Sequence, residues 1–111
     1  MIKVAVLDDY QDVFRQIVET EKYKEKFNFH VFKEPFLNEN ETIVALEEFE
    51  ALFIMRERTP ITKSLITSLP KLKYIMTSGM RNNSIDLETT KKNKIIVIAG
   101  IAARTKTALI T

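Results

Sequence analysis

Short apolar runs recur along this chain of 111 residues, and each is followed by a polar stretch whose apolar residues have helical spacing. The runs cover residues 2–7, 27–32, 51–55, 72–76 and 95–98. Runs of this length that are apolar on both faces are typical of strands covered by helices on both sides. The alternation therefore predicts an α/β fold built on a parallel sheet.

The polar stretches between these runs predict the helices. We expect helices over residues 10–21, 40–47, 62–69 and 87–92. Asp8 or Asp9 can cap the first of them, and Asp86 can cap the last. Because right-handed crossovers leave few arrangements of five such units, we predict a flavodoxin-like, doubly wound, five-stranded parallel sheet. Its expected strand order is 2-1-3-4-5, with helices on both faces.

The composition, with two glycines, one histidine and no cysteine, excludes several chemistries. A G-x-G-x-x-G nucleotide loop needs three glycines, and zinc sites or thiol nucleophiles need cysteine or several histidines. We therefore expect no metal site. His30 falls in the middle of an expected strand, so we interpret it as a structural or edge histidine.

Charge and hydropathy limit the expected partners and location. The formal net charge of +2 is too small for a nucleic-acid footprint unless the basic residues cluster in one patch. No apolar run approaches the roughly 20 residues that span a bilayer. The first run is too short, and too soon followed by acidic residues, for a signal peptide. We expect a soluble, cytoplasmic protein that binds neither nucleic acid nor membrane.

Polar residues follow two of the expected strands, at the edge where doubly wound folds bind ligands. Arg56, Glu57, Arg58 and Thr59 follow the third run, whereas Ser78 and Gly79 follow the fourth. Two guanidinium groups and free backbone amides suit a small carboxylate, and a glycine lets a ligand approach the backbone. The alternative is that the arginines pair with Glu57 or with neighbouring surface acids, and that Gly79 only forms a turn.

The acidic pair Asp8 and Asp9 also invites comparison with a phosphoreceiver domain, in which carboxylates hold Mg²⁺ beside a phosphoacceptor Asp. A receiver needs an Asp at the end of the third strand and a Lys at the end of the fifth. This chain has Met55-Arg56 and Ala99-Gly100 at those positions. Helix capping is the better interpretation of the acidic pair.

Four segments together resemble a known family. They are KVAVLDDYQD (residues 3–12), IMRERT (54–59), LPKLKYI (69–75), and SG with NSIDL (78–79 and 83–87). Their order and spacing are similar to those of the amino-terminal domain of NAD-dependent D-isomer-specific 2-hydroxyacid dehydrogenases. In that family the amino-terminal, flavodoxin-like domain binds the substrate. A second, inserted Rossmann domain binds NAD and supplies the catalytic Arg, Glu and His.

The resemblance implies that residues 56–59 form the substrate loop, which meets the carboxylate of a 2-hydroxy or 2-keto acid. Ser78 and Gly79 line the other side of the cleft by the same comparison. The glycine fingerprint, the ribose-binding acid and the Arg-Glu-His machinery are missing from the 111 residues. We therefore assign no catalytic or cofactor-binding residue, and expect NAD, the family's cofactor, not to bind this chain alone.

Two functions are compatible with the sequence. In the first, residues 1–100 are the substrate-binding domain of a truncated oxidoreductase, inactive alone, and residues 101–111 start a crossover helix toward the missing NAD-binding domain. In the second, the chain is a free-standing, non-catalytic flavodoxin-like module that binds a small carboxylate or a protein partner. Its terminal segment could then exchange between two chains and give a homodimer. A coding sequence that continues past Thr111 would favour the first.

Overall fold

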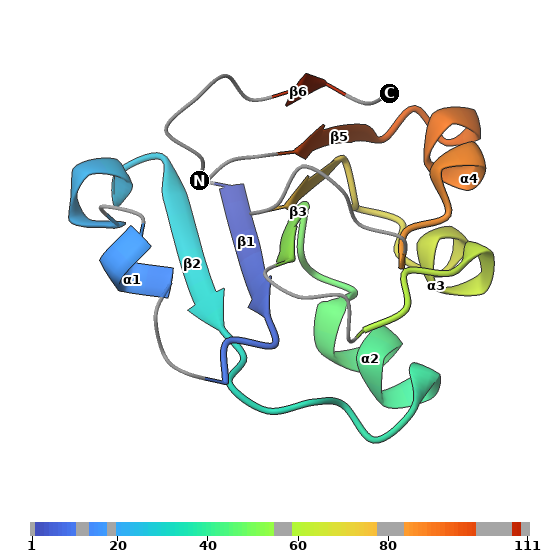
Figure 1. Cartoon of the computed structure of the whole chain (residues 1–111), viewed down its shortest axis with the longest axis horizontal. Coiled ribbons are helices and arrows are strands. Elements are labelled where there is room, and N and C mark those ends of the chain that lie inside the picture. The colour runs from blue at the N-terminus through green and yellow to red at the C-terminus, as the bar shows by residue number, and fades with distance from the viewer. Residues whose placement is uncertain are drawn as a thin grey trace.

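The computed structural model describes residues 2–10, 14–17, 20–54, 59–77, 84–99 and 108–109. Its sheet consists of β1 (Ile2–Leu7), β2 (Phe27–Val31), β3 (Ala51–Ile54), β4 (Tyr74–Thr77), β5 (Ile96–Ala99) and β6 (Ala108–Leu109). Along the sheet the strands lie in the order β2-β1-β3-β4-β5-β6 (Figure 1). All pairings from β2 to β5 are parallel, which confirms the predicted order 2-1-3-4-5.

The short strand β6 was not expected. It pairs antiparallel with β5, with Leu109 opposite Ile98 and Ala108 opposite Ala99. Because an extended pair of residues cannot be part of an α-helix, the helix predicted beyond residue 101 does not continue through these two positions. The rest of that predicted helix, residues 101–107 and 110–111, lies outside the described residues.

Alternate residues of the strands enter two separate cores, as the period of a strand requires. Ala5 and Leu7 of β1 belong to the larger core, whereas Val4 and Val6 belong to the smaller one. Helices α2 (Glu39–Leu46), α3 (Lys63–Thr67) and α4 (Leu87–Lys92) lie along one side of the sheet (Figure 1). On the other side, Phe14 of α1 (Phe14–Ile17) packs on Phe29 and Phe53, so both faces are covered by helices.

Polar side chains cap the helices. Asp86 accepts a hydrogen bond from the Thr89 amide at 3.1 Å, which confirms it as the cap of α4. Thr62 caps α3 through the Leu65 amide at 3.2 Å. Helix α2 begins one residue earlier than the predicted residue 40, because Asn38 is its cap, with its Oδ1 atom 2.9 Å from the Glu41 amide nitrogen.

The first helix differs most from its prediction over residues 10–21. Among the described residues of that range, the α-helix covers Phe14–Ile17, and a 3-10 helix, η1 (Thr20–Tyr23), follows. Asp9 accepts a hydrogen bond from the Phe14 amide at 3.0 Å, so this aspartate contacts the first described residue of α1. Strand β4 also begins two residues late, because the Leu72 amide bonds to the Leu69 carbonyl in a turn.

Candidate functional site

Two segments that follow neighbouring strands form the candidate site at the carboxyl edge of the sheet. Ile54, the last residue of β3, is the register partner of Thr77, the last residue of β4. Farther along, the Ile61 amide donates to the Ser84 carbonyl at 2.8 Å, and the Asp86 amide donates to the Ile61 carbonyl at 2.9 Å. The chain therefore enters the two predicted loops at a pair of register partners and leaves them at a pair of hydrogen-bonded residues.

One of the six predicted site residues, Thr59, belongs to the described part of the chain, where it is buried with 7% of its surface exposed. The other five, Arg56, Glu57, Arg58, Ser78 and Gly79, lie outside the described residues. The described flanks of the two loops are side by side, as the prediction requires. The contacts that these five side chains make with a ligand stay a prediction.

The Thr59 side chain is fixed by a residue at the end of β1. Its hydroxyl donates to Oδ2 of Asp8 at 2.6 Å, while the Tyr10 hydroxyl donates to Oδ1 at 3.0 Å. The Asp8 residue is 1% exposed and has a φ of 59°, a left-handed conformation that aspartate tolerates better than most residues. A buried carboxylate needs such donors, so Asp8 and Thr59 fix each other's positions.

The turn between β1 and α1 does not suit a dinucleotide. In dinucleotide-binding folds, a glycine-rich turn at this place leaves free backbone amides at the start of the helix for the pyrophosphate. Here the amide of Phe14 already donates to Asp9, and both Asp8 and Asp9 are buried carboxylates that would repel an anion. Neither glycine of the chain, at positions 79 and 100, lies in this turn. The residues present do not fit NAD here.

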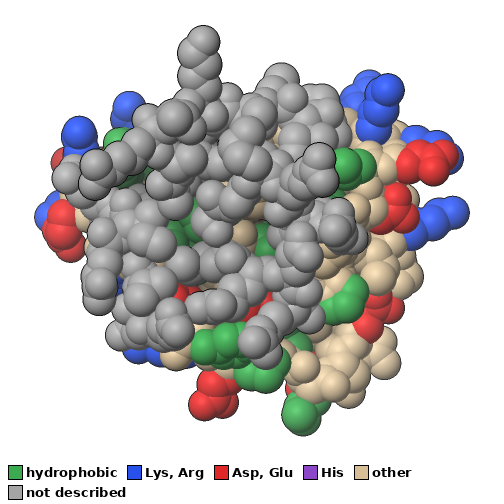
Figure 2. Space-filling model, in the orientation of Figure 1, with side chains coloured by type: hydrophobic (Ala, Val, Ile, Leu, Met, Phe, Trp, Pro, Cys, Tyr) green, Lys and Arg blue, Asp and Glu red, His purple; other side chains and the backbone are tan. Residues whose placement is uncertain are grey.

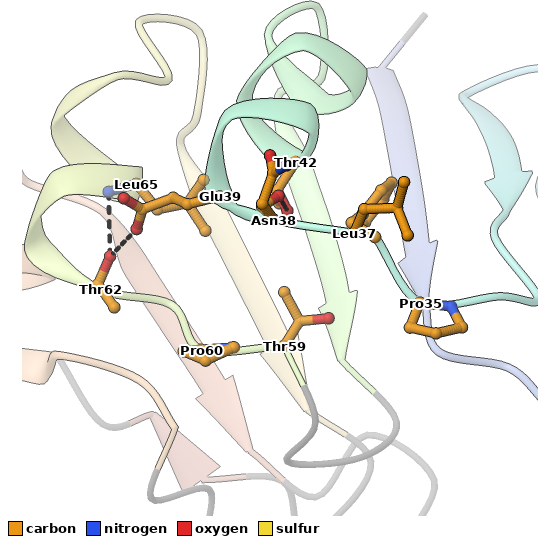
Figure 3. A pocket seen from close by; sticks show the side chains of 10 residues that line it. Pro35, Leu37, Asn38, Glu39, Thr42, Thr59, Pro60, Thr62 and Leu65 are labelled. Atoms are coloured by element: carbon orange, nitrogen blue, oxygen red, sulfur yellow. Dashed lines mark hydrogen bonds between the residues drawn. The ribbon is translucent and has the colours of Figure 1, made fainter.

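A pocket of 480 Å³ opens beside Thr59, between the loop that leads into α2 and the start of α3 (Figure 3). Its apolar walls come from Pro35, Phe36, Leu37, Pro60 and Leu65, and its polar lining comes from Asn38, Glu39, Thr42, Thr59 and Thr62. This volume is in the range of small-molecule sites. The pocket therefore has the size and mixed lining that a small organic ligand requires.

Glu39 supplies the charge of this pocket. Its carboxylate accepts hydrogen bonds from the hydroxyls of Thr62 and Ser64, the latter at 2.7 Å (Figure 3 draws the Thr62 bond). These two bonds, that from Thr62 being the stronger influence, lower the pKa of the Glu39 carboxyl below its usual value, against a small opposing effect of burial. The group is therefore ionised at neutral pH and held in place.

The sequence profile of a family described as D-isomer specific 2-hydroxyacid dehydrogenase, catalytic domain, matches residues 4–108. The chain belongs to this family. Among solved structures, a phosphoglycerate oxidoreductase from Vibrio cholerae is 37% identical to this 2-hydroxyacid dehydrogenase domain, with a TM-score of 0.78. The alignment covers 89% of this chain and 31% of the Vibrio protein, so the domain spans about a third of that relative's length.

Two further structures give the same picture of the dehydrogenase domain. A protein from Ralstonia solanacearum, assigned as a D-3-phosphoglycerate dehydrogenase, is 33% identical, with a TM-score of 0.79. The alignment covers 89% of this chain and 29% of the Ralstonia chain. The acyclic imino acid reductase Bsp5, solved with NADPH and D-Arg, is 28% identical, with a TM-score of 0.71, and the alignment covers 88% of this chain and 30% of the reductase chain. The curated proteins contain no significant match.

Sequence reasoning missed three residues of the candidate site and the pocket beside it. It interpreted Asp8 only as a helix cap, and it did not single out Asn38 or Glu39. The polar run at residues 38–41, directly after the loop from β2, was the available signal, since that loop also ends at the carboxyl edge. The link between Asp8 and Thr59 joins positions 51 residues apart, which no local pattern can reveal.

Two other features considered from the sequence are His30 and the charged surface residues. His30 is on β2, at the edge of the sheet, and its ring packs on Phe49 with centroids 5.3 Å apart, as a structural or edge histidine should. Basic and acidic side chains lie next to each other along the edge formed by α3 and α4 (Figure 2), as the Lys92–Glu88 ion pair at 3.4 Å illustrates.

Two further kinds of feature are absent from the described ranges. No group of three or more His, Asp or Glu side chains there is arranged to hold a metal ion. In that part of the chain, none of the helices has the length and apolar character needed to cross a membrane.

Proposed function

We propose that this chain forms the substrate-binding part of an NAD-dependent oxidoreductase that acts on the CH–OH group of 2-hydroxy acids. The single observation that carries the proposal is the pairing of the two loop flanks, Ile54 with Thr77 and Ile61 with Ser84. It supports one cleft between residues 55–58 and 78–83, at the edge where doubly wound folds bind ligands.

In this proposal the carboxylate of a 2-hydroxy or 2-keto acid binds to the loop that ends at Thr59. Arg56 and Arg58 supply positive charge, and backbone amides of the loop supply hydrogen bonds. Because the Thr59 hydroxyl already donates to Asp8, Thr59 acts as the fixed end of the loop and not as a hydroxyl donor to the ligand. Glu57, Ser78 and Gly79 complete the lining of the cleft.

Hydride transfer needs a cofactor site and an acid–base group, and we propose that these 111 residues supply neither. NAD would supply the hydride acceptor or donor, and we propose that a separate domain holds it together with the family's catalytic Arg, Glu and His. The purified 111-residue chain is then expected not to oxidise NADH in the presence of glyoxylate or hydroxypyruvate. Saturable oxidation by the pure chain, at a rate that follows its concentration, would contradict this division of roles.

The substrate-binding role is tested by calorimetric titration of the chain with hydroxypyruvate. We expect Arg58→Ala and Arg56→Ala to weaken binding at least about tenfold each, since a charged hydrogen bond contributes roughly 1.5–3 kcal/mol. Arg15→Ala removes the same charge from α1 and serves as the matched control. If the wild type and both loop variants bound hydroxypyruvate with equal affinity, neither arginine would contribute to substrate binding.

Two other expectations stay predictions. The first is the cytoplasmic location of the protein. The second is a homodimer formed through the C-terminal segment, which light scattering after size-exclusion chromatography would detect as a mass of twice 12.9 kDa. A single monomeric mass at high protein concentration would contradict the homodimer.

A further inference from the structure

We propose that the pocket beside Thr59 receives the group attached to C3 of the bound acid, and that Glu39 makes this subsite selective against anionic groups. The inference rests on the proposed function, because it places the carboxylate of the acid at the loop that ends at Thr59. It adds the substrate class: 2-hydroxy or 2-keto acids whose remaining substituent is neutral or positively charged.

Thr59 connects the two parts of the proposed site. It is the last residue of the candidate carboxylate loop, and it also lines the pocket together with Pro60. Its bond to the buried Asp8 fixes its place at the carboxyl edge of the sheet. In this arrangement the substituent of an acid bound at the loop extends past Thr59 into the pocket.

The lining of the pocket limits what that substituent can be. Apolar side chains, including Phe36, Leu37 and Leu65, favour an aliphatic chain. None of the described residues that line the pocket is a lysine or an arginine, so these residues offer no positive partner for a phosphate or a second carboxylate. A substituent with its own negative charge would lose water without gaining an opposite charge.

Glu39 adds direct repulsion to that cost. Its carboxylate is oriented by Thr62 and Ser64, so it does not depend on the ligand for its position. The bonds that lower the pKa of Glu39 keep it negative throughout the neutral range. It also leaves a guanidinium or ammonium group on the ligand with a preorganised acceptor. Because Glu39 is exposed, water and salt weaken both effects, and the expected selectivity is a few fold and not orders of magnitude.

The test compares three 2-oxo acids that differ in the charge of their substituent. They are 2-oxobutyrate (neutral), 2-oxoglutarate (anionic) and 2-oxo-5-guanidinopentanoate (cationic), each titrated into the whole chain at low ionic strength. We expect the wild type to bind 2-oxoglutarate most weakly. In Glu39→Gln, the affinity for 2-oxoglutarate divided by the affinity for 2-oxobutyrate should rise about two- to fivefold, as expected for removing one partly screened charge.

Glu41→Gln is the matched control. Glu41 is on the same helix and is exposed, and it does not line this pocket. Glu41→Gln changes the net charge by the same amount as Glu39→Gln, but it should leave the affinity ratio unchanged. An equal affinity ratio in the wild type and Glu39→Gln, or an equal change of the ratio in the two variants, would contradict the selectivity of Glu39 but not the proposed function. If the wild type bound none of the three acids, that result would contradict both the proposed function and this inference.

Discussion

The Thr59 hydroxyl lies 2.6 Å from the Asp8 carboxylate, and this bond ties the loop after β3 to the end of β1. The two residues are 51 positions apart in the chain and both are buried. Leu7, which precedes Asp8, is the register partner of Ile54, which precedes the loop. The loop of residues 55–58 is therefore held at both ends against the same strand.

Removal of the Thr59 hydroxyl should destabilise the domain. Thr59→Val keeps the shape of the side chain but leaves one oxygen of the buried Asp8 without its donor. We expect the free energy of unfolding to fall by about 1–3 kcal/mol, measured by urea denaturation. Thr59→Ser keeps the hydroxyl and should lose less than Thr59→Val. If the two variants were equally stable, the hydrogen bond would have no role in stability.

Two substitutions of Asp8 test how its backbone conformation and its side-chain hydrogen bonds contribute to stability. Asn tolerates a φ of 59° and keeps an acceptor for Tyr10 or Thr59, whereas Ala tolerates this φ poorly and has no acceptor. We therefore expect Asp8→Ala to lower the free energy of unfolding by at least about 2 kcal/mol and Asp8→Asn to lower it by less. Urea denaturation of both variants provides the comparison, and the reverse order would refute it.

At the end of α4, replacing one residue with glycine should stabilise the fold. The Lys94 amide donates to the Lys91 carbonyl and the Ile95 amide to the Thr90 carbonyl, the pair of bonds that ends many helices with a left-handed residue. Lys94 has a φ of 59° at that position. Lys94→Gly should raise the free energy of unfolding by about 0.5–1 kcal/mol.

Lys91→Gly is the control for that substitution, because it places glycine within α4 and should lower stability by a similar amount. Both effects can be read from thermal denaturation. A loss of stability in Lys94→Gly would show that the side chain of Lys94 contributes more than its backbone conformation costs.

The pKa of Glu39 should reflect the hydrogen bonds from its two hydroxyl partners, Thr62 and Ser64. Because the folded-state pKa is lowered below the ordinary value of 4.5, the carboxylate's bonds stabilise the fold above that value. The contribution is lost as the pH falls through the lower, folded pKa. We expect a carboxyl NMR titration to give a pKa below 4.5 in the wild type. Thr62→Val should raise it, since Thr62 is the first cause of the shift, and an unchanged pKa would exclude that cause.

Much of the fold could be predicted because the signals are local. Residues 2–7 and 51–54 are apolar on both faces, and the right-handed crossover restricts how such strands can be ordered. Asp86 precedes its helix at the spacing of a cap and proved to be one. These features depend on residues within a few positions of each other, which a sequence displays directly.

The features that could not be predicted depend on distant or competing contacts. The role of Asp8 requires Thr59 from another loop, and the pocket requires Glu39 of α2 beside Thr62, the cap of α3. Asp9 contacts the Phe14 amide five positions ahead, which is farther than the usual spacing of a cap. Strand β6 forms by pairing with β5, a tertiary contact that overrides the helical pattern of its own sequence.

The most direct test of the central claim is a titration of the ¹⁵N-labelled chain with hydroxypyruvate, followed by amide chemical shifts. The account predicts that the largest changes among described residues fall at the carboxyl edge, on Ile54, Thr59, Thr77 and Ser84. Amides of η1 and of the amino-terminal ends of the strands should serve as internal references. Changes confined to those reference amides, or none at saturating ligand, would contradict a substrate site between the two loops.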